Sequence, residues 1–360
     1  MKDLTSRYMK TSVKKLQKLL KDKKLRALLV SDRNNVRYLC GFVGTNGKLL
    51  VTPAKHVLIT DARYFETARK CGVPYYDQFK GLKGVMGRYK VIGFEAENMT
   101  VARLKKYRQA VPGVKFRPTA GLVESLRLIK GEGEIRIIKK AVKIACRSLE
   151  ELVKKIRPGV SEDELEWELL KIARKNGAEG FSFPPVITFG KDTADIHHQK
   201  GDNRLKPGEM ILIDFGIVFQ GYITDMTRVF FQLKPAEFEQ KIYTAVLEAN
   251  QAAVKAVKTG MKLADLDKVA RKVIEKAGFG KNFTHGLGHG TGLEVHEAPI
   301  VSGKSKECVQ PGMVFTIEPG IYVPGKGGVR IEDMVYIKPN GKAEVLTKCV
   351  KTTESAMLPV

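Results

Sequence analysis

The chain has 360 residues, with 63 Lys and Arg against 39 Asp and Glu, so its formal net charge is +24. Hydrophobic residues make up 43% of it, which excludes whole-chain disorder. No stretch approaches the roughly 18 consecutive apolar residues that a membrane helix needs. The five cysteines are widely spread and form no Cys-x-x-Cys pair, which argues against a disulfide framework or zinc finger and favours a cytoplasmic protein.

The charge excess lies in the first third of the chain. Residues 1–130 contain 29 Lys and Arg against 9 Asp and Glu, a net charge of +20, whereas the remainder is close to balance at +4. Five of the six histidines lie between positions 197 and 296. We therefore expect two domains, residues 1–130 and 131–360, with the chemistry in the second. Because the positive charge lies away from the histidines, a nucleic-acid partner is not expected.

The first domain shows strand and helix patterns in alternation. An amphipathic helix is predicted over residues 5–25, where Val13, Leu16 and Leu20 recur at helical spacing among lysines that we expect to face solvent. Predicted strands cover residues 27–30, 36–42, 49–52, 56–60 and 91–95, and further helices cover residues 62–70 and 101–110. This alternation predicts a small α/β domain.

The second domain contains an internal repeat. Helices are predicted over residues 134–155 and 160–175, the latter beginning with a capping box of Ser161 and Glu164. The pattern recurs 101 residues later, where Gly159, Leu165, Lys175 and Gly177 correspond to Gly260, Leu266, Lys276 and Gly278. A duplicated unit predicts pseudo-two-fold symmetry, with a site between the halves.

Two predicted hairpins carry acidic residues inside apolar strands. In the first, MILIDFGIVFQGYITDMTRVFF (residues 210–231), Asp214 and Asp225 are equidistant from a turn at Gln220-Gly221 if its centre lies between Phe219 and Gln220. The spacing then predicts that the two acids face each other, with Cβ atoms about 5 Å apart. Such a pair is costly in a core unless a cation lies between its members.

In the second hairpin, Glu318 and Glu332 are symmetric about Gly325, so they too are predicted to face each other. Between the hairpins lies HGLGHGTGLEVHE (residues 285–297), in which glycines let the backbone approach closely and place an imidazole. Four carboxylates and one histidine favour Mn²⁺ over Zn²⁺, with Co²⁺ acceptable. So many acids suit two metal ions about 4 Å apart.

At these residues the sequence resembles the pita-bread metallopeptidases, specifically the Xaa-Pro peptidases, prolidase and aminopeptidase P. The resemblance is carried by IDFG (213–216), TDMTR (224–228), HGLGHGTGLEVHE (285–297), TIEPGIY (316–322) and GGVRIED (327–333). It implies an α+β fold, in which a pita-bread domain with an internal pseudo-two-fold repeat follows a smaller α/β domain. Residues 35–42 and 60–65 resemble the small N-terminal domain of the same enzymes, which in that family supports dimer formation.

The resemblance also implies roles for individual residues. Asp214, Asp225, His289, Glu318 and Glu332 would be the metal ligands, with Asp225 and Glu332 bridging both ions and Glu318 also handling the proton of the bridging water. His197 and His296 would contact the scissile carbonyl and its tetrahedral intermediate. Arg330 would position the substrate or orient a ligand carboxylate.

One segment departs from the family pattern. In GKDTADIHHQ (residues 190–199), Asp192 stands where the family usually has Asn and Ile196 where it has Pro, and His198 directly follows His197. We assign the family histidine to His197. These changes bear on substrate preference more than on activity.

The resulting hypothesis is a dinuclear metallo-exopeptidase that cleaves the bond before proline in dipeptides or at the N-terminus of longer peptides. Its expected partners are a proline-containing peptide and a second copy of the chain, with no membrane. The alternative is a catalytically inactive pita-bread module that binds protein or nucleic acid; a creatinase-like amidine hydrolase is a third possibility. Both alternatives predict loss of ligands, and all five are present here.

Overall fold

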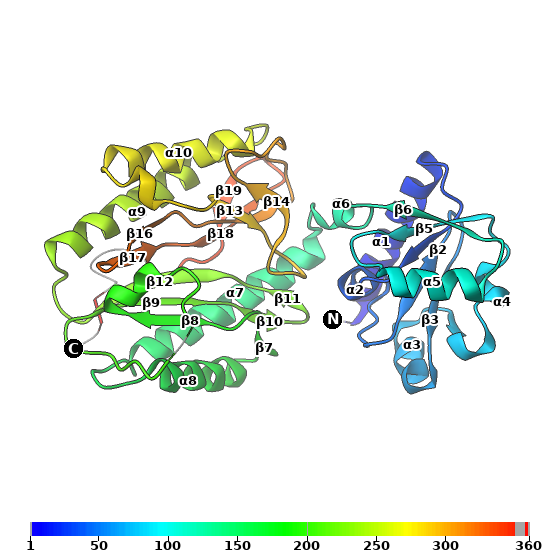
Figure 1. Cartoon of the computed structure of the whole chain (residues 1–360), viewed down its shortest axis with the longest axis horizontal. Coiled ribbons are helices and arrows are strands. Elements are labelled where there is room, and N and C mark those ends of the chain that lie inside the picture. Colours follow the sequence, from blue (N-terminus) through cyan, green and yellow to red (C-terminus); the bar gives the residue numbers. More distant parts are fainter. Residues whose placement is uncertain (1, 200, 350–356, 359–360) are drawn as a thin grey trace. The chain divides into compact units, whose positions relative to one another are not determined.

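The computed structural model describes residues 2–199, 201–349 and 357–358, and the chain divides into two compact units, Met1–Arg127 and Leu128–Val360. Figure 1 shows both units, coloured along the sequence. No helix in the described part of the chain is long and apolar enough to cross a membrane.

The first unit is built around a six-stranded mixed sheet of order β4-β3-β2-β1-β5-β6 (Figure 1). Strands β1, β5 and β6 are parallel to one another, and β2 is antiparallel to β1. Its elements are α1 (Lys2–Asp22), β1 (Leu28–Val30), α2 (Arg33–Cys40), β2 (Lys48–Val51), β3 (His56–Thr60), the 3₁₀ helix η1 (Ala62–Tyr64), α3 (Phe65–Cys71), β4 (Tyr75–Asp77), η2 (Gln78–Lys80), α4 (Lys83–Met86), β5 (Val91–Glu95), α5 (Val101–Ala110), β6 (Lys115–Thr119) and α6 (Glu124–Arg127).

The predicted amphipathic helix is confirmed as α1. Val13, Leu16 and Leu20 are buried, while Lys14 and Lys18 are exposed, so the lysines form a solvated face. The strand predicted over residues 36–42 is wrong, because these residues form most of α2.

Local capping explains why α2 is helical. The Asp32 side chain accepts a hydrogen bond from the Asn35 N–H at the start of the helix, and Gly41 ends it in the left-handed conformation with φ of 71°. These two signals outweigh the β preference of Val36 and Tyr38.

The second unit consists of two helix pairs with strands between them (Figure 1). Its elements are α7 (Glu132–Val153), α8 (Glu162–Lys175), β7 (Gly180–Phe181), β8 (Val186–Phe189), η3 (Gly190–Ala194), β9 (Met210–Phe215), β10 (Ile217–Phe219), β11 (Tyr222–Ile223), β12 (Met226–Phe231), α9 (Glu237–Ala256), α10 (Leu263–Lys276), η4 (Gly280–Asn282), β13 (Gly288–Gly290), β14 (Glu297–Val301), β15 (Val314–Ile317), β16 (Gly320–Val323), β17 (Gly327–Arg330), β18 (Asp333–Ile337) and β19 (Ala343–Val345).

The predicted duplication is visible in the topology. Helix α8 and helix α10 are displaced by 101 residues at both ends. The strand pairings β8-β9-β12 in the first half recur as β13-β15-β18 in the second, all antiparallel. The corresponding turn glycines Gly159 and Gly260 have φ of 87° and 82°. The capping box of Ser161 and Glu164 is also confirmed.

Each half has its own hydrophobic core. Residues of α7 and α8, such as Leu149 and Leu169, pack with Ile211 and Phe230 from the first group of strands. Val246 and Leu266 of α9 and α10 pack with strands of the second group, including Phe315. Burial of these aliphatic faces anchors the strands firmly, which positions the polar side chains that they carry.

Candidate metal centre

The five predicted ligands all lie in or beside strands of the second unit. Asp214 is in β9 and Asp225 directly precedes β12, while His289 is in β13, Glu318 directly follows β15, and Glu332 directly precedes β18. Asp225, His289 and Glu332 are buried, and the side chains of Asp214 and Glu318 are 14% and 16% exposed. Charged groups are therefore concentrated in a largely apolar environment.

The first hairpin has a different register from the predicted one. Asp214 pairs with Thr227, and Phe219 pairs with Tyr222 across a two-residue turn. Gln220 and Gly221 both have positive φ, 49° and 73°, as a two-residue hairpin turn requires. The turn centre therefore lies between these two residues, one position later than predicted, so Asp225 is displaced by two residues from the position opposite Asp214.

The second hairpin has the predicted register. Ile317 pairs with Asp333 on one side of the two glutamates, and Gly320 pairs with Arg330 on the other. This register places Glu318 opposite Glu332 at the junction between the two strand pairs. The spacing of residues about Gly325 was therefore sufficient to predict this contact region.

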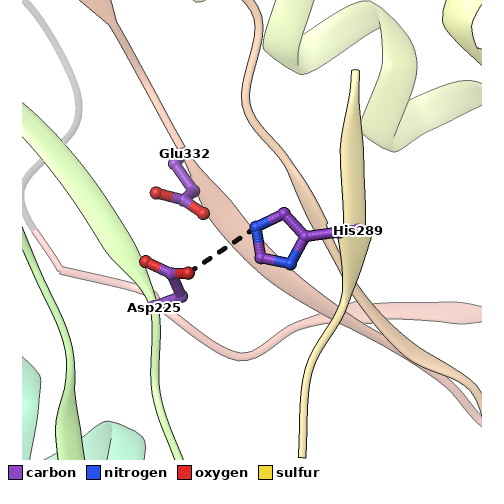
Figure 2. Close-up of side chains that lie close together, drawn as sticks. All are labelled: Asp225, His289 and Glu332. Carbon is purple, nitrogen blue, oxygen red and sulfur yellow. Dashed lines mark ion pairs between the residues drawn. The ribbon is translucent and has the colours of Figure 1, made fainter. Parts of the chain in front are cut away.

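Three of the five side chains converge closely. Asp225, His289 and Glu332 each offer a ligand atom, and these atoms all lie within 4.8 Å of one another. Figure 2 shows the two carboxylates pointing toward the imidazole ring from separate strands. The Nε2 atom of His289 lies 3.7 Å from Asp225 Oδ2 and 3.3 Å from Glu318 Oε1. Glu318 is thus also part of the cluster.

Glycines on either side of His289 are required by close backbone contacts. A Cβ atom on Gly288 would lie 2.1 Å from the Thr316 carbonyl oxygen, and one on Gly290 would lie 2.1 Å from that of Ala298. Any other residue would push β13 away from its neighbours. The glycine framing of the imidazole that the sequence indicated therefore has a steric cause.

The imidazole of His289 presents a lone pair to the acids. Burial, together with the nearby His296, lowers its pKa to about 4, so the ring is neutral at pH 7. Its Nδ1 lies 3.1 Å from the Gly290 carbonyl oxygen, which assigns the ring proton to Nδ1 and leaves Nε2 unprotonated. An unprotonated nitrogen that faces carboxylates is suited to a cation between them.

The acids repel one another. Burial and the negative charges of Asp214 and Glu318 raise the pKa of Asp225 well above its ordinary value. Burial and the charges of Asp225, Glu318 and Asp214 do the same for Glu332. For Glu318, burial and Asp214 raise the pKa to about 7 despite the opposing charge of Arg330. A bound cation would relieve this repulsion by stabilising the ionised forms.

Arg330 connects the two halves of the site. Its Nη2 donates to Asp214 Oδ2 at 2.5 Å, and its Nε donates to Thr227 Oγ1 at 2.9 Å. The Thr227 hydroxyl in turn donates to Glu332 Oε2 at 2.8 Å. The other oxygen of Asp214, Oδ1, is buried and has no hydrogen-bond partner in the described part of the chain. Arg330 therefore orients Asp214 and leaves one of its oxygens available as a ligand.

Tyr322 and His285 extend this network, and neither was assigned a role from the sequence. The Tyr322 hydroxyl accepts from Arg330 Nη1 at 2.9 Å and lies 3.0 Å from His285 Nε2. His285 Nδ1 lies 2.8 Å from the Gly286 carbonyl oxygen, so the ring proton belongs there and Tyr322 donates to Nε2. Thr227, Tyr322 and His285 all lie within the quoted motifs, and this was the one sequence signal that could have pointed to them.

The predicted carbonyl-contacting histidines differ in placement. His296 is exposed, and its ring centroid lies 4.3 Å from that of His289, so it lies at the solvent side of the cluster. His197 is exposed, and its side chain forms no hydrogen bond or ion pair with any described residue. Its neighbour His198 instead contacts the buried Glu162, with Nε2 3.0 Å from either carboxylate oxygen. His198 is therefore held by a structural contact with Glu162, whereas the side chain of His197 is exposed.

A buried ion pair that the sequence analysis missed supports the His296 segment. Lys130 Nζ lies 2.7 Å from Glu297 Oε1, and the two side chains are 1% and 8% exposed. The other oxygen of Glu297 accepts from the Leu293 N–H at 3.3 Å. No spacing rule connects residues 167 positions apart, so only the tertiary structure could show this pair.

Comparisons with known proteins find relatives along most of the chain. Residues 136–339 match the model of metallopeptidase family M24, and residues 13–129 match the creatinase/prolidase N-terminal domain. The Xaa-Pro dipeptidase of Pyrococcus horikoshii is 34% identical over 348 residues, spanning 94% of this chain and 97% of that protein.

Solved structures give the same result. The Xaa-Pro dipeptidase from Bacillus anthracis is 35% identical and has a TM-score of 0.90, covering 96% of this chain and 99% of its own. The X-Pro aminopeptidase from Thermotoga maritima is 34% identical with a TM-score of 0.86, covering 92% and 99%. The expected pita-bread fold and N-terminal domain are thereby confirmed, as is the expectation of a metallo-exopeptidase. This chain belongs to metallopeptidase family M24 and carries the creatinase/prolidase N-terminal domain.

Proposed function

We propose that the chain is a dinuclear metal exopeptidase that hydrolyses the Xaa-Pro peptide bond. The names of its relatives include both Xaa-Pro dipeptidases and an X-Pro aminopeptidase, so dipeptides and longer peptides are both candidate substrates. The amide bond before proline has no N–H, and the proline ring fixes the backbone conformation. An enzyme that cleaves this bond therefore needs a pocket shaped for proline.

The donor set fits two divalent ions. Asp214, Asp225, His289, Glu318 and Glu332 would hold them, and the oxygen-rich chemistry favours Mn²⁺, with Co²⁺ or Zn²⁺ as alternatives. The observation that carries this proposal is the cluster of repelling buried acids around an unprotonated His289 Nε2, together with the unpartnered Oδ1 of Asp214. A structural core would not retain these groups unless a cation neutralised them.

Ions in such a site supply Lewis-acid polarisation of a carbonyl and acidify a coordinated water. Glu318, whose Oε1 lies 3.3 Å from His289 Nε2 in the cluster, would handle the proton of that water. Arg330 would hold Asp214 in its ligand orientation through their short hydrogen bond. His296, exposed beside His289, and His197 would donate hydrogen bonds to the carbonyl oxygen as negative charge develops on it.

The division of labour between the two parts of the chain follows from this site. Every proposed ligand lies in residues 131–360, so we assign catalysis to that domain and an accessory role to residues 1–130. We expect the accessory domain to support a homodimer in the cytoplasm. The net charge of +20 in residues 1–130 would then affect solubility rather than the reaction.

The test is a peptidase assay with Ala-Pro and with a longer Xaa-Pro-Xaa peptide, in the presence of Mn²⁺ and with or without EDTA. We expect EDTA-sensitive cleavage of at least one peptide and none of Ala-Ala. The variant Asp225→Asn should lose metal-dependent turnover, whereas Asp265→Asn, a control at a half-buried acid that contacts Lys268, should retain it. Absence of hydrolysis of either peptide by metal-loaded protein would overturn the proposal and favour an inactive binding module.

A further inference from the structure

Two cysteines far apart in the sequence meet beneath the first group of strands. The Sγ atoms of Cys146, on α7, and Cys349, in the segment after β19, lie 2.7 Å apart. Both are free thiols, Cys146 half-buried and Cys349 5% exposed. The two sulfur atoms are therefore only about 0.7 Å farther apart than in a disulfide bond.

The backbone around Cys349 is held in this position. Arg228, on β12, is 2% exposed and donates to the carbonyl oxygens of Thr347 at 2.8 Å and Cys349 at 3.3 Å. It also pairs with Asp333 Oδ1 at 3.0 Å. Arg228 thus attaches the backbone at Thr347 and Cys349 to two strands of the catalytic unit, β12 and β18.

The surroundings also distinguish the two sulfur atoms chemically. The hydrogen bond from the Cys146 thiol and, against the effect of burial, the charge of Arg228 lower the pKa of Cys349. The same hydrogen bond and burial raise the pKa of Cys146. The sulfur atom with the lowered pKa is the more reactive of the two toward an oxidant, and a thiol in contact with it can resolve the product.

We propose that Cys146 and Cys349 are a redox modification site, where a peroxide drives formation of a reversible disulfide between α7 and the segment that follows β19. The Cys349 sulfur attacks one peroxide oxygen, the O–O bond breaks, and a sulfenic acid forms with release of water. The Cys146 sulfur then displaces the sulfenic hydroxyl as a second water. Two thiols and one hydrogen peroxide give one disulfide and two waters, and a dithiol reductant reverses the change.

The disulfide would close a loop between residues 203 positions apart. Closing a long loop restrains the unfolded chain, so the oxidised protein should melt about 5–15 °C higher than the reduced protein. The sulfur atoms are not among the proposed metal ligands, so the primary consequence is stabilisation of the fold.

The experiment uses the full-length protein with and without hydrogen peroxide. Thiol titration in denaturant should fall from five to three, and the intact mass should fall by about 2 Da. Tryptic mapping without reductant should yield a linked pair of the peptides IACR (residues 144–147) and CVK (residues 349–351). Dithiothreitol should restore five thiols and abolish the rise in melting temperature.

The variant Cys146→Ser should lose the linked peptide and the melting shift, whereas Cys308→Ser, a matched control at another half-buried cysteine, should keep both. If Cys146→Ser does not fold, the peptide map of the unaltered protein decides the question. Five titratable thiols after oxidation, a link between other cysteines, or a disulfide between two chains would each overturn the proposal.

Discussion

The two halves of the catalytic unit share a topology but differ in chemistry. Both consist of a helix pair and an antiparallel strand group, with α8 and α10 displaced by 101 residues. The first half contributes Asp214 and Asp225, and the second contributes Glu318 and Glu332 together with His289 and Arg330. Duplication therefore explains why two acidic hairpins face each other, while divergence supplied the imidazole and guanidinium on one side only.

The hairpin registers differ as well. In the second half the two glutamates face each other, whereas in the first half Asp214 faces Thr227. Thr227 accepts a hydrogen bond from Arg330 and donates one to Glu332. The residue opposite Asp214 in the first half therefore holds a carboxylate of the second half in place. Residues at equivalent positions of the duplicated strands can therefore have different roles. Substitutions in each half test how large this difference is.

The largest expected effect comes from comparing the two central acids. Asp225→Asn in the first half and Glu332→Gln in the second should each lower kcat/KM by at least about 10³-fold, because metal polarisation contributes several kcal/mol and each tenfold is about 1.4 kcal/mol. Bound Mn²⁺ per chain should fall in both. Metal analysis and steady-state kinetics measure both effects. A variant that keeps full activity and full metal content would show that the substituted acid is not a ligand.

The next effect concerns the link between the halves. Arg330→Met should reduce metal affinity or activity by about 10- to 100-fold, since it orients Asp214 and contacts Thr227. Thr227→Val keeps the shape of the side chain but removes its hydroxyl, so we expect a smaller loss in the same direction. Titration of the metal-free protein with Mn²⁺ measures both. Equal affinity for the two variants and the unaltered protein would show that the link has no function.

The pH dependence of the metal-free protein tests the acid cluster in both halves together. Burial and Asp214 raise the folded-state pKa of Glu318 from 4.5 to about 7, so the folded protein binds more protons than the unfolded chain between these values. Its free energy of unfolding should therefore fall as pH rises through this window, by up to about 1.4 kcal/mol per pH unit for each extra proton.

Urea unfolding at pH 5, 6 and 7 measures this slope. Mn²⁺ should reduce or reverse it, because the ion binds the ionised carboxylates. Glu318→Gln should have a shallower slope than the unaltered protein. The same slope with and without Glu318 would contradict the assigned shift.

The smallest expected effect tests the equivalence of the two turns. Gly159 and Gly260 have nearly the same positive φ, 87° and 82°, and open space where a Cβ would lie. Alanine at either position should therefore cost about 1–2 kcal/mol through backbone strain alone. Denaturant unfolding of Gly159→Ala and Gly260→Ala should give matching losses, and a clear difference would show that the turns are not equivalent.

Several parts of the fold could be predicted because their signals are local. The spacing of Val13, Leu16 and Leu20 was sufficient for α1, and Ser161 with Glu164 marked the start of α8. Residues 36–42 were predicted wrongly because the caps at Asp32 and Gly41 outweigh β propensity. In the first hairpin, a turn centre misplaced by one residue moved the partner of Asp214 by two. Partners in a hairpin lie at equal distances from the turn centre, so moving the centre by one residue moves every partner by two.

The sequence by itself determined which acids and which histidine to expect in the cluster, the duplicated order of elements and the register of the second hairpin, because each depends on residue chemistry or short spacing. Only the tertiary structure decided that the carboxylate bonded to Arg330 is that of Asp214, 116 residues away, that Lys130 pairs with Glu297, and that Cys146 meets Cys349. These contacts arise when buried faces of separate elements pack together. Hydrophobic burial brings such residues together from any distance along the chain, so no local pattern records the contact.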